Sequence, residues 1–266
     1  MVVKHETKQE IAPETEIEAL AGIPVQLYTE IGGKRVFSSP GICRGCGSLL
    51  AMKIALSVAD NCVAIVSPGA LSYQTANAPV LSLGANACAA AVGVSRAMKD
   101  KIVICFADYK STQENLGAIT SAATTNENMI YICINDSQGI HTFARSIRAK
   151  YDATASVGYL EDYINKLNKA KEMFGFRFID VFCPCPRQWG FNPSDTLQLA
   201  RLASDTRLWP LYEIDNDILY LTKRPKQEPV HHFFSAMSHQ LPPEEIQHLQ
   251  HKANRIWKLL SEGRIV

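Results

Sequence analysis

Short apolar runs alternate with longer segments of helical periodicity along most of this chain. In 161–173, for example, Tyr163, Leu167 and Ala170 fall on one side of a helix. Continuous apolar runs between helices are typical of a parallel sheet that is covered on both faces. We therefore predict an α/β fold with strands over 62–66, 102–106, 129–134 and 176–182, and helices over 48–59, 86–98, 116–124 and 161–173.

In such a sheet, ligands bind beyond the carboxyl ends of the strands. The segments that follow the predicted strands are 67–79, 107–115, 135–146 and 183–190, and we interpret them as ligand-presenting loops.

The two ends of the chain differ from this alternating region. Residues 1–35 are interpreted as a leader and extension, 36–225 as the α/β domain, and 226–266 as a C-terminal tail that ends in a helix. Pro243 and two glutamates begin that helix, as proline and acids do in a first turn. Its apolar stripe consists of Ile246, Leu249, Ala253, Ile256 and Leu260.

The composition excludes several classes of protein. The chain has 266 residues, 47% hydrophobic and 20% charged, with a formal net charge of +1, so neither a nucleic acid nor an anionic membrane is indicated as its partner. It shows no apolar run of the roughly 18 residues that a membrane helix needs. The polar N-terminus lacks a signal-peptide pattern, and we expect a cytoplasmic protein.

Eight cysteines divide into two groups. Cys62, Cys88, Cys105 and Cys133 lie in predicted strands or helices and are expected in the core. Cys43, Cys46, Cys183 and Cys185 lie in loops rich in glycine or proline. Cys43 and Cys46 form a CxxC motif that could bind a metal or an iron–sulfur cluster. Thiol exchange, or two unligated cysteines in a turn, are the alternatives.

Polar residues at strand ends are the other candidates for chemistry. Asp108 and Asp136 follow neighbouring predicted strands and could bind Mg²⁺ together, although a helix cap explains an aspartate there equally well. His141 could be a base or a ligand, or an ordinary loop histidine. Asn86 could bind a ligand or cap the alanine-rich helix.

Several common motifs are absent. The sequence has no GxGxxG after a strand, no GxxxxGK[ST] and no GxSxG. A Rossmann dehydrogenase, a P-loop nucleotidase and a serine hydrolase are therefore poor interpretations.

The motifs together resemble the β subunits of 2-oxoacid:ferredoxin oxidoreductases, the pyruvate type in particular. The resemblance covers about 36–262. The segments that carry it are Gly41-Ile42-Cys43-Arg44-Gly45-Cys46-Gly47, Asn86-Ala87, Asp108, 126–133, 151–159, Pro184-Cys185-Pro186 and 209–214.

The resemblance implies a thiamine-diphosphate-binding fold with Mg²⁺ and a [4Fe-4S] cluster. Asp108 matches the aspartate of the family's Gly-Asp-Gly and Asp136 its second Mg²⁺ ligand, while Gln138 falls where a backbone carbonyl binds the metal. Asn86 and Thr142 match cofactor-binding positions. His141 replaces an asparagine near the substrate and is the candidate catalytic residue. Cys43, Cys46 and Cys185 match three of the four cluster cysteines.

The implied enzyme converts a 2-oxoacid and coenzyme A to CO₂ and acyl-CoA. Electrons pass through the cluster to ferredoxin. The implied partners are an α subunit, with γ and δ subunits in some arrangements.

Several departures leave a second interpretation open. Tyr109 replaces a glycine that lets the backbone approach the diphosphate, Ala70 stands near the expected fourth cysteine, and Phe143 replaces a glycine. A segment of the family between Ser146 and Tyr151 is missing. The alternative is a thiamine-free, non-catalytic subunit with a structural or electron-transfer role.

Overall fold

The computed structural model describes residues 43–59, 61–67, 80–82, 86–136, 146–237 and 241–264. Within them, one sheet has the strand order β2-β1-β3-β4-β6-β5-β7-β8. The strands are β1 (Cys62–Val66), β2 (Val80–Ser82), β3 (Ile102–Asp108), β4 (Met129–Asn135), β5 (Tyr151–Ser156), β6 (Phe176–Phe182), β7 (Tyr212–Asp215) and β8 (Ile218–Leu221).

The first six strands of the chain run parallel, and a hairpin extends the sheet at one edge. Strand β7 pairs antiparallel with β5, and β8 pairs antiparallel with β7. In the central pair, Ile104 of β3 is opposite Ile130 of β4, and Asp108 is opposite Ile134. This register brings the ends of β3 and β4 to the same edge of the sheet.

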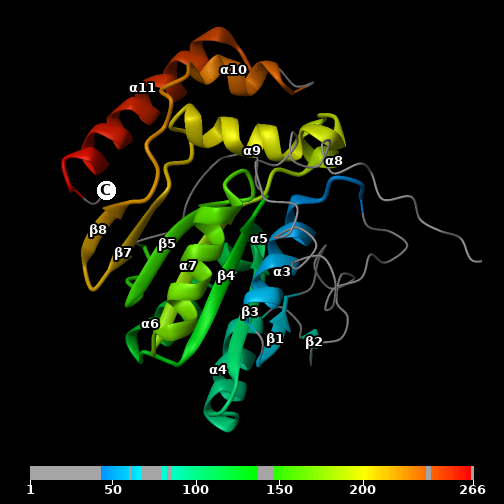
Figure 1. Cartoon of the computed structure of the whole chain (residues 1–266), viewed down its shortest axis with the longest axis vertical. Helices are drawn as coiled ribbons and strands as arrows, with labels where there is room; N and C mark the ends of the chain where they lie inside the picture. Colours follow the sequence, from blue (N-terminus) through cyan, green and yellow to red (C-terminus); the bar gives the residue numbers. More distant parts are fainter. Residues whose placement is uncertain are drawn as a thin grey trace, which may run out of the picture.

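Helices cover both faces of the sheet (Figure 1). The helices are α3 (Gly47–Val58), α4 (Ala87–Ala97), α5 (Tyr109–Glu114), α6 (Leu116–Thr124), α7 (Leu160–Glu172), α8 (Pro186–Trp189), α9 (Thr196–Asp205), α10 (Val230–Ser235) and α11 (Pro243–Ser261), with a short 3₁₀ helix, η1, over Pro193–Asp195.

Two apolar cores form because successive strand side chains point to opposite faces. Ala64 and Val66 of β1 face a core that includes α3, α7, α9 and α10, whereas Val63 and Ile65 face a core with α4 and α6. The central strands are buried on both faces. This explains why the predicted runs 62–66 and 129–134 are apolar throughout and confirms the predicted α/β class.

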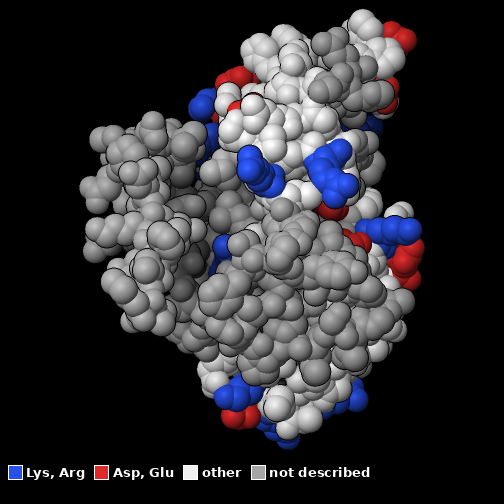
Figure 2. Space-filling view, turned by 90° about the vertical axis from the view of Figure 1, so that its right-hand side faces the viewer, with Lys and Arg blue, Asp and Glu red and all other residues white. Residues whose placement is uncertain are grey.

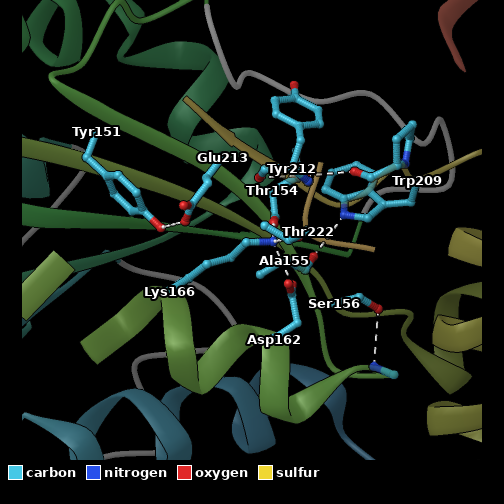
Figure 3. Close-up of polar contacts among 12 residues, drawn as sticks. Tyr151, Thr154, Ala155, Ser156, Asp162, Lys166, Trp209, Tyr212, Glu213 and Thr222 are labelled. Atoms are coloured by element: carbon cyan, nitrogen blue, oxygen red, sulfur yellow. Dashed lines mark hydrogen bonds and ion pairs between the residues drawn. The ribbon is translucent and has the colours of Figure 1, made fainter. Parts of the chain in front are cut away.

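A buried lysine of α7 forms hydrogen bonds with the sheet (Figure 3). The Lys166 ammonium lies 2.6 Å from the Asp162 carboxylate one turn earlier. It also donates to the Thr154 carbonyl at 2.8 Å and to the Thr222 hydroxyl at 2.7 Å. Three oxygen partners satisfy the three donors of the ammonium, which explains how a lysine is tolerated at 2% side-chain exposure.

Most of the predicted elements are confirmed. Strands 62–66 and 176–182 and helix 116–124 have the bounds that the pattern predicted, and the other predicted strands and helices are present with small shifts at their ends. The predictions of loops over 107–115 and 183–190 were wrong in part, because α5 occupies Tyr109–Glu114 and α8 occupies Pro186–Trp189. Both are short helices, which have too few turns for an apolar period to show.

The charged surface agrees with the balanced composition. On the face in Figure 2, Lys and Arg alternate with Asp and Glu over the described residues, and neither sign forms a continuous patch there. No helix in the described ranges has the length and apolar character of a membrane span.

Candidate cofactor-binding site

Polar residues and a cysteine from four segments lie at or beyond the carboxyl ends of neighbouring strands. Ser67 follows β1, Asp108 ends β3, Asp136 follows β4, and Cys183 follows β6. These strands are adjacent in the order β1-β3-β4-β6. Hydrogen bonds continue past the strand ends, from Ser67 N to Phe106 O at 2.9 Å and from Cys183 N to Asn135 O at 2.8 Å.

Asp108 is both a strand end and a helix cap. Its Oδ1 accepts the Ser111 backbone N–H at 2.7 Å, and its Oδ2 accepts the Ser111 hydroxyl at 3.0 Å. The Ser67 hydroxyl donates to Oδ2 at 3.5 Å. The prediction that this aspartate caps a helix is therefore confirmed, and these donors fix the orientation of the carboxylate at the edge of the sheet.

Asp136 lies close enough to Asp108 for their charges to interact. Burial raises the pKa of Asp136 to about 6, and the Asp108 carboxylate contributes to the rise. Gln188 Nε2 donates to Asp136 Oδ2 at 3.5 Å, and Trp189 Nε1 donates to the Asp136 carbonyl at 3.0 Å. Two like charges at one partly buried edge are an arrangement that a divalent cation stabilises.

The Tyr109 side chain is packed rather than exposed at this edge. It packs against the core that includes α4 and α6. Burial raises the pKa of the phenol, and the charges of Asp180 and Cys133 contribute. The Tyr109 side chain is thus partly buried on that face of the sheet.

The CxxC loop and the loop after β6 lie side by side. Cys46 caps α3, and its Sγ accepts the Leu49 N–H at 3.5 Å. Burial raises the pKa of the Cys46 thiol, and the nearby Cys185 and Cys43 raise it further. Arg187 Nη1 lies 3.9 Å from Cys43 Sγ. The structure thus brings together the three cysteines that the family resemblance selected.

Gly45 fits this loop tightly against its neighbours. It has φ +66°, and its carbonyl accepts the Thr196 hydroxyl at 2.7 Å. A Cβ at Gly45 would collide with the Pro193 carbonyl. The loop therefore requires glycine between the two cysteines.

The thiols do not by themselves form a metal site. Among the described residues, no three His, Cys, Asp or Glu side chains are arranged to hold a metal ion.

Some of the predicted site residues lie outside the described residues. They are Gln138, His141 and Thr142, together with the substituted positions Ala70 and Phe143. Asn86 caps α4, with its Oδ1 accepting the Ala89 N–H at 3.1 Å.

The prediction that Cys62, Cys88, Cys105 and Cys133 belong to the core is confirmed, since all four are buried. Cys183, which was grouped with the loop cysteines, is also fully buried, because it directly follows β6 and packs into the core. Sequence reasoning missed Ser67, Ser111 and Gln188, and it interpreted Trp189 as a packing or contact aromatic. Ser111 could have been found from its spacing, because a serine three residues after an N-cap can hydrogen-bond with it. Nothing in the sequence indicated the contacts of Gln188 and Trp189 with Asp136, which depend on the tertiary fold.

Comparisons with known proteins find several relatives of this chain, although no family model matches it. Pyruvate synthase subunit PorB of Methanothermobacter thermautotrophicus is 32% identical over 253 residues, covering 75% of this chain and 88% of the relative. Ketoisovalerate oxidoreductase subunit VorB of Pyrococcus abyssi is 43% identical over 83 residues, which is 31% of this chain and 27% of that one.

A solved 2-oxoglutarate:ferredoxin oxidoreductase from Magnetococcus marinus has the same fold. Its TM-score is 0.50 at 19% identity, covering 59% of this chain and 68% of the matched chain. This likeness shows that the two chains share a fold. The extent of the match to PorB identifies the family, and this chain belongs to the β subunits of 2-oxoacid:ferredoxin oxidoreductases.

Proposed function

We propose that this β subunit takes part in the oxidative decarboxylation of a pyruvate-type 2-oxoacid to acyl-CoA, with ferredoxin as electron acceptor. The names of its PorB relatives support pyruvate as the substrate type. The proposed assembly contains an α subunit, with γ and δ subunits in some arrangements, and works in the cytoplasm.

The observation that carries the proposal is the pair of carboxylates at the sheet edge. Asp108 and Asp136 come from adjacent strands and their charges interact. Oxygen ligands of this kind suit Mg²⁺, which bridges protein carboxylates to phosphate groups. Two carboxylates in the described residues would hold a magnesium ion for the diphosphate of thiamine diphosphate. The family resemblance adds the carbonyl of Gln138, which lies outside the described residues, as a further ligand.

Thiamine diphosphate, when bound, supplies the chemistry that cleaves the carboxylate from the 2-oxoacid. The residues of this chain would bind and orient it. Ser67 and Ser111 hold the Asp108 carboxylate by hydrogen bonds. Gln188 holds the Asp136 carboxylate. Asn86 and Thr142 would contact the cofactor and His141 the substrate, and the glutamate that activates the thiamine would come from a partner subunit.

The iron–sulfur part of the proposal rests on three neighbouring thiols. Cys43 and Cys185 lie near enough to Cys46 to contribute to the raised pKa of its thiol, which supports a shared role. They are not an adequate set for a four-thiolate cluster in the described residues. A complete cluster would need another ligand or a rearranged loop, so we assign these cysteines to a cluster without deriving any electron-transfer step.

The second candidate function is a thiamine-free subunit that keeps the fold and the partner surface. Tyr109 favours it, since a residue with a side chain begins α5 where the family has glycine. The packing of the Tyr109 ring against the core of α4 and α6 favours the first function, because it gives the side chain a place in that core.

Thiamine diphosphate content decides between the two functions. It would be measured by thiochrome fluorescence in the complex purified anaerobically with its native partners. We expect about one thiamine diphosphate per β subunit. A complex without thiamine diphosphate that still carries iron and sulfide would instead support the thiamine-free function.

Two variants of Asp108 separate metal binding from helix capping. Asp108→Ala removes the cap and the charge, whereas Asp108→Asn keeps a good N-cap and removes only the charge. We expect both variants to lose Mg²⁺-dependent binding of thiamine diphosphate, measured by calorimetry. Wild-type affinity in Asp108→Asn would refute the assignment of Asp108 as a metal ligand.

A further inference from the structure

We propose that Trp189 is a positioning residue for the Asp136 metal ligand, acting through the hydrogen bond from its indole N–H. The inference rests on the proposed magnesium site. Trp189 Nε1 donates to the Asp136 carbonyl at 3.0 Å. This bond holds the backbone of Asp136 one residue beyond the last strand bond, which joins Asn135 O to Cys183 N at 2.8 Å.

The indole can act as a fixed support because it is itself immobilised. Trp189 is 2% exposed. Its ring packs edge-to-face against Phe182, with centroids 5.7 Å apart, and against Phe233, also at 5.7 Å. Phe182 ends β6 and Phe233 lies in α10, so the position of the indole N–H is set by the sheet and by the C-terminal region together.

The same short helix carries a second donor to Asp136. Gln188 Nε2 reaches the Asp136 Oδ2 at 3.5 Å, from an exposed position beside Trp189. One turn of α8 thus contacts both the carbonyl and the carboxylate of a single residue. Hydrogen bonds of this type orient metal ligands, and their loss typically weakens metal binding about 10- to 100-fold.

Helix α8 also connects Asp136 to the cysteine loop. Cys185 is its N-cap, and the Cys185 carbonyl accepts the Trp189 N–H at 3.0 Å and the Gln188 N–H at 3.1 Å. The residue proposed to bind iron and the residues that hold Asp136 are therefore parts of one hydrogen-bonded turn. This connection sets the spacing between the proposed magnesium site and the proposed cluster.

A second tryptophan provides a matched control. Trp209 is 1% exposed, contacts the same Phe182 ring at 5.2 Å, and donates its indole N–H to the Ala155 carbonyl at 2.8 Å (Figure 3). Ala155 belongs to β5 and is not a candidate ligand. Replacing either tryptophan by phenylalanine removes one indole hydrogen bond from the same aromatic cluster, but only one of these bonds leads to Asp136.

The experiment compares Trp189→Phe and Trp209→Phe in the anaerobic complex with its native partners. The Mg²⁺ concentration for half-maximal binding of thiamine diphosphate is measured by calorimetry, together with thermal stability and iron content. We expect Trp189→Phe to raise this concentration about tenfold. Trp209→Phe should stay within about twofold of the wild type despite a comparable loss of stability.

If the wild type binds thiamine diphosphate and the two variants show equal Mg²⁺ dependence, the role of Trp189 is overturned, whereas the proposed function still stands. A wild-type complex that binds no thiamine diphosphate would overturn the proposed function and this inference together.

If the Trp189→Phe subunit does not assemble into the complex, Gln188→Leu is used as the test variant. This substitution removes a donor to Asp136 from an exposed position without altering the core. We expect it to weaken Mg²⁺ binding severalfold, and unchanged binding would refute the positioning role of α8.

Discussion

Asp136 has a pKa of about 6 because it is largely buried and because the Asp108 carboxylate lies at the end of the neighbouring strand. Folding thus brings together two acidic groups that the sequence separates by more than a strand and two helices. Without a bound cation, the repulsion between these two carboxylates would lower the stability of the folded protein at neutral pH.

Asp136→Asn should therefore stabilise the metal-free protein at neutral pH. The folded pKa of Asp136 is raised, so its contribution is most favourable below the unfolded pKa and is lost as pH rises through about 6. We expect a gain on the order of 3 kcal/mol at pH 7, since the pKa rises from 3.8 to about 6 and one pKa unit corresponds to about 1.4 kcal/mol. Chemical denaturation with a chelator present would measure it.

The gain should disappear as the pH falls to about 4, where the wild-type carboxyl is also neutral. Excess Mg²⁺ with thiamine diphosphate should reverse the order of stability at pH 7, because the wild type alone gains from the metal. If the difference in unfolding free energy between the two proteins does not change with pH, the effect does not arise from the ionisation of this carboxyl group.

Cys46→Ser should lower the iron and sulfide content of the complex. The Cys46 thiol lies near Cys43 and Cys185, and serine is a poor substitute for a thiolate ligand of iron. Cys62→Ser is the matched control, since Cys62 is a buried core residue of β1. Iron and acid-labile sulfide would be assayed after anaerobic purification. Equal content in the two variants would remove Cys46 from the cluster.

Gly45→Ala should lower bound iron although it retains every thiol. A Cβ at this position would collide with the backbone carbonyl of Pro193, and φ is +66°. The loop that carries Cys43 and Cys46 must then move. Gly117→Ala in α6 is the control, because a Cβ there meets no atom within 4 Å and alanine favours a helix.

Iron content and thermal stability, measured together, distinguish displacement of the loop from general unfolding. We expect Gly45→Ala to lower both and Gly117→Ala to lower neither. Full iron content in Gly45→Ala would show that the geometry of the CxxC loop does not govern cluster binding.

Lys166→Met should destabilise the fold by about 3 kcal/mol, as expected when one partner of a buried ion pair is removed. The substitution leaves Asp162 and the Thr154 carbonyl without the ammonium that they contact at 2.6 and 2.8 Å. Denaturant unfolding would measure the change in free energy.

Lys110→Met is the control for that prediction. Lys110 and Glu114 are also four residues apart, but they are 3.9 Å apart and exposed. Exposed pairs contribute little, and we expect a change within about 0.5 kcal/mol. Similar losses in the two variants would contradict the importance of burial.

The sequence by itself determined the class of fold and the order of its elements. Strands such as 62–66 and 129–134 are apolar throughout because both faces are buried, and this property is visible in the sequence. The motifs around Cys43, Asp108 and Cys185 were also sufficient to identify the family, because each depends on local spacing.

Only the tertiary structure decided how these residues act on one another. The pKa of Asp136 depends on Asp108, which reaches it through the parallel pairing of β3 and β4. The roles of Gln188 and Trp189 depend on the packing of α8 beside β4, which no local pattern records. Burial and contact between distant segments arise only when the chain folds and its strands pair. The electrostatics of the site therefore follow from the fold and not from any motif.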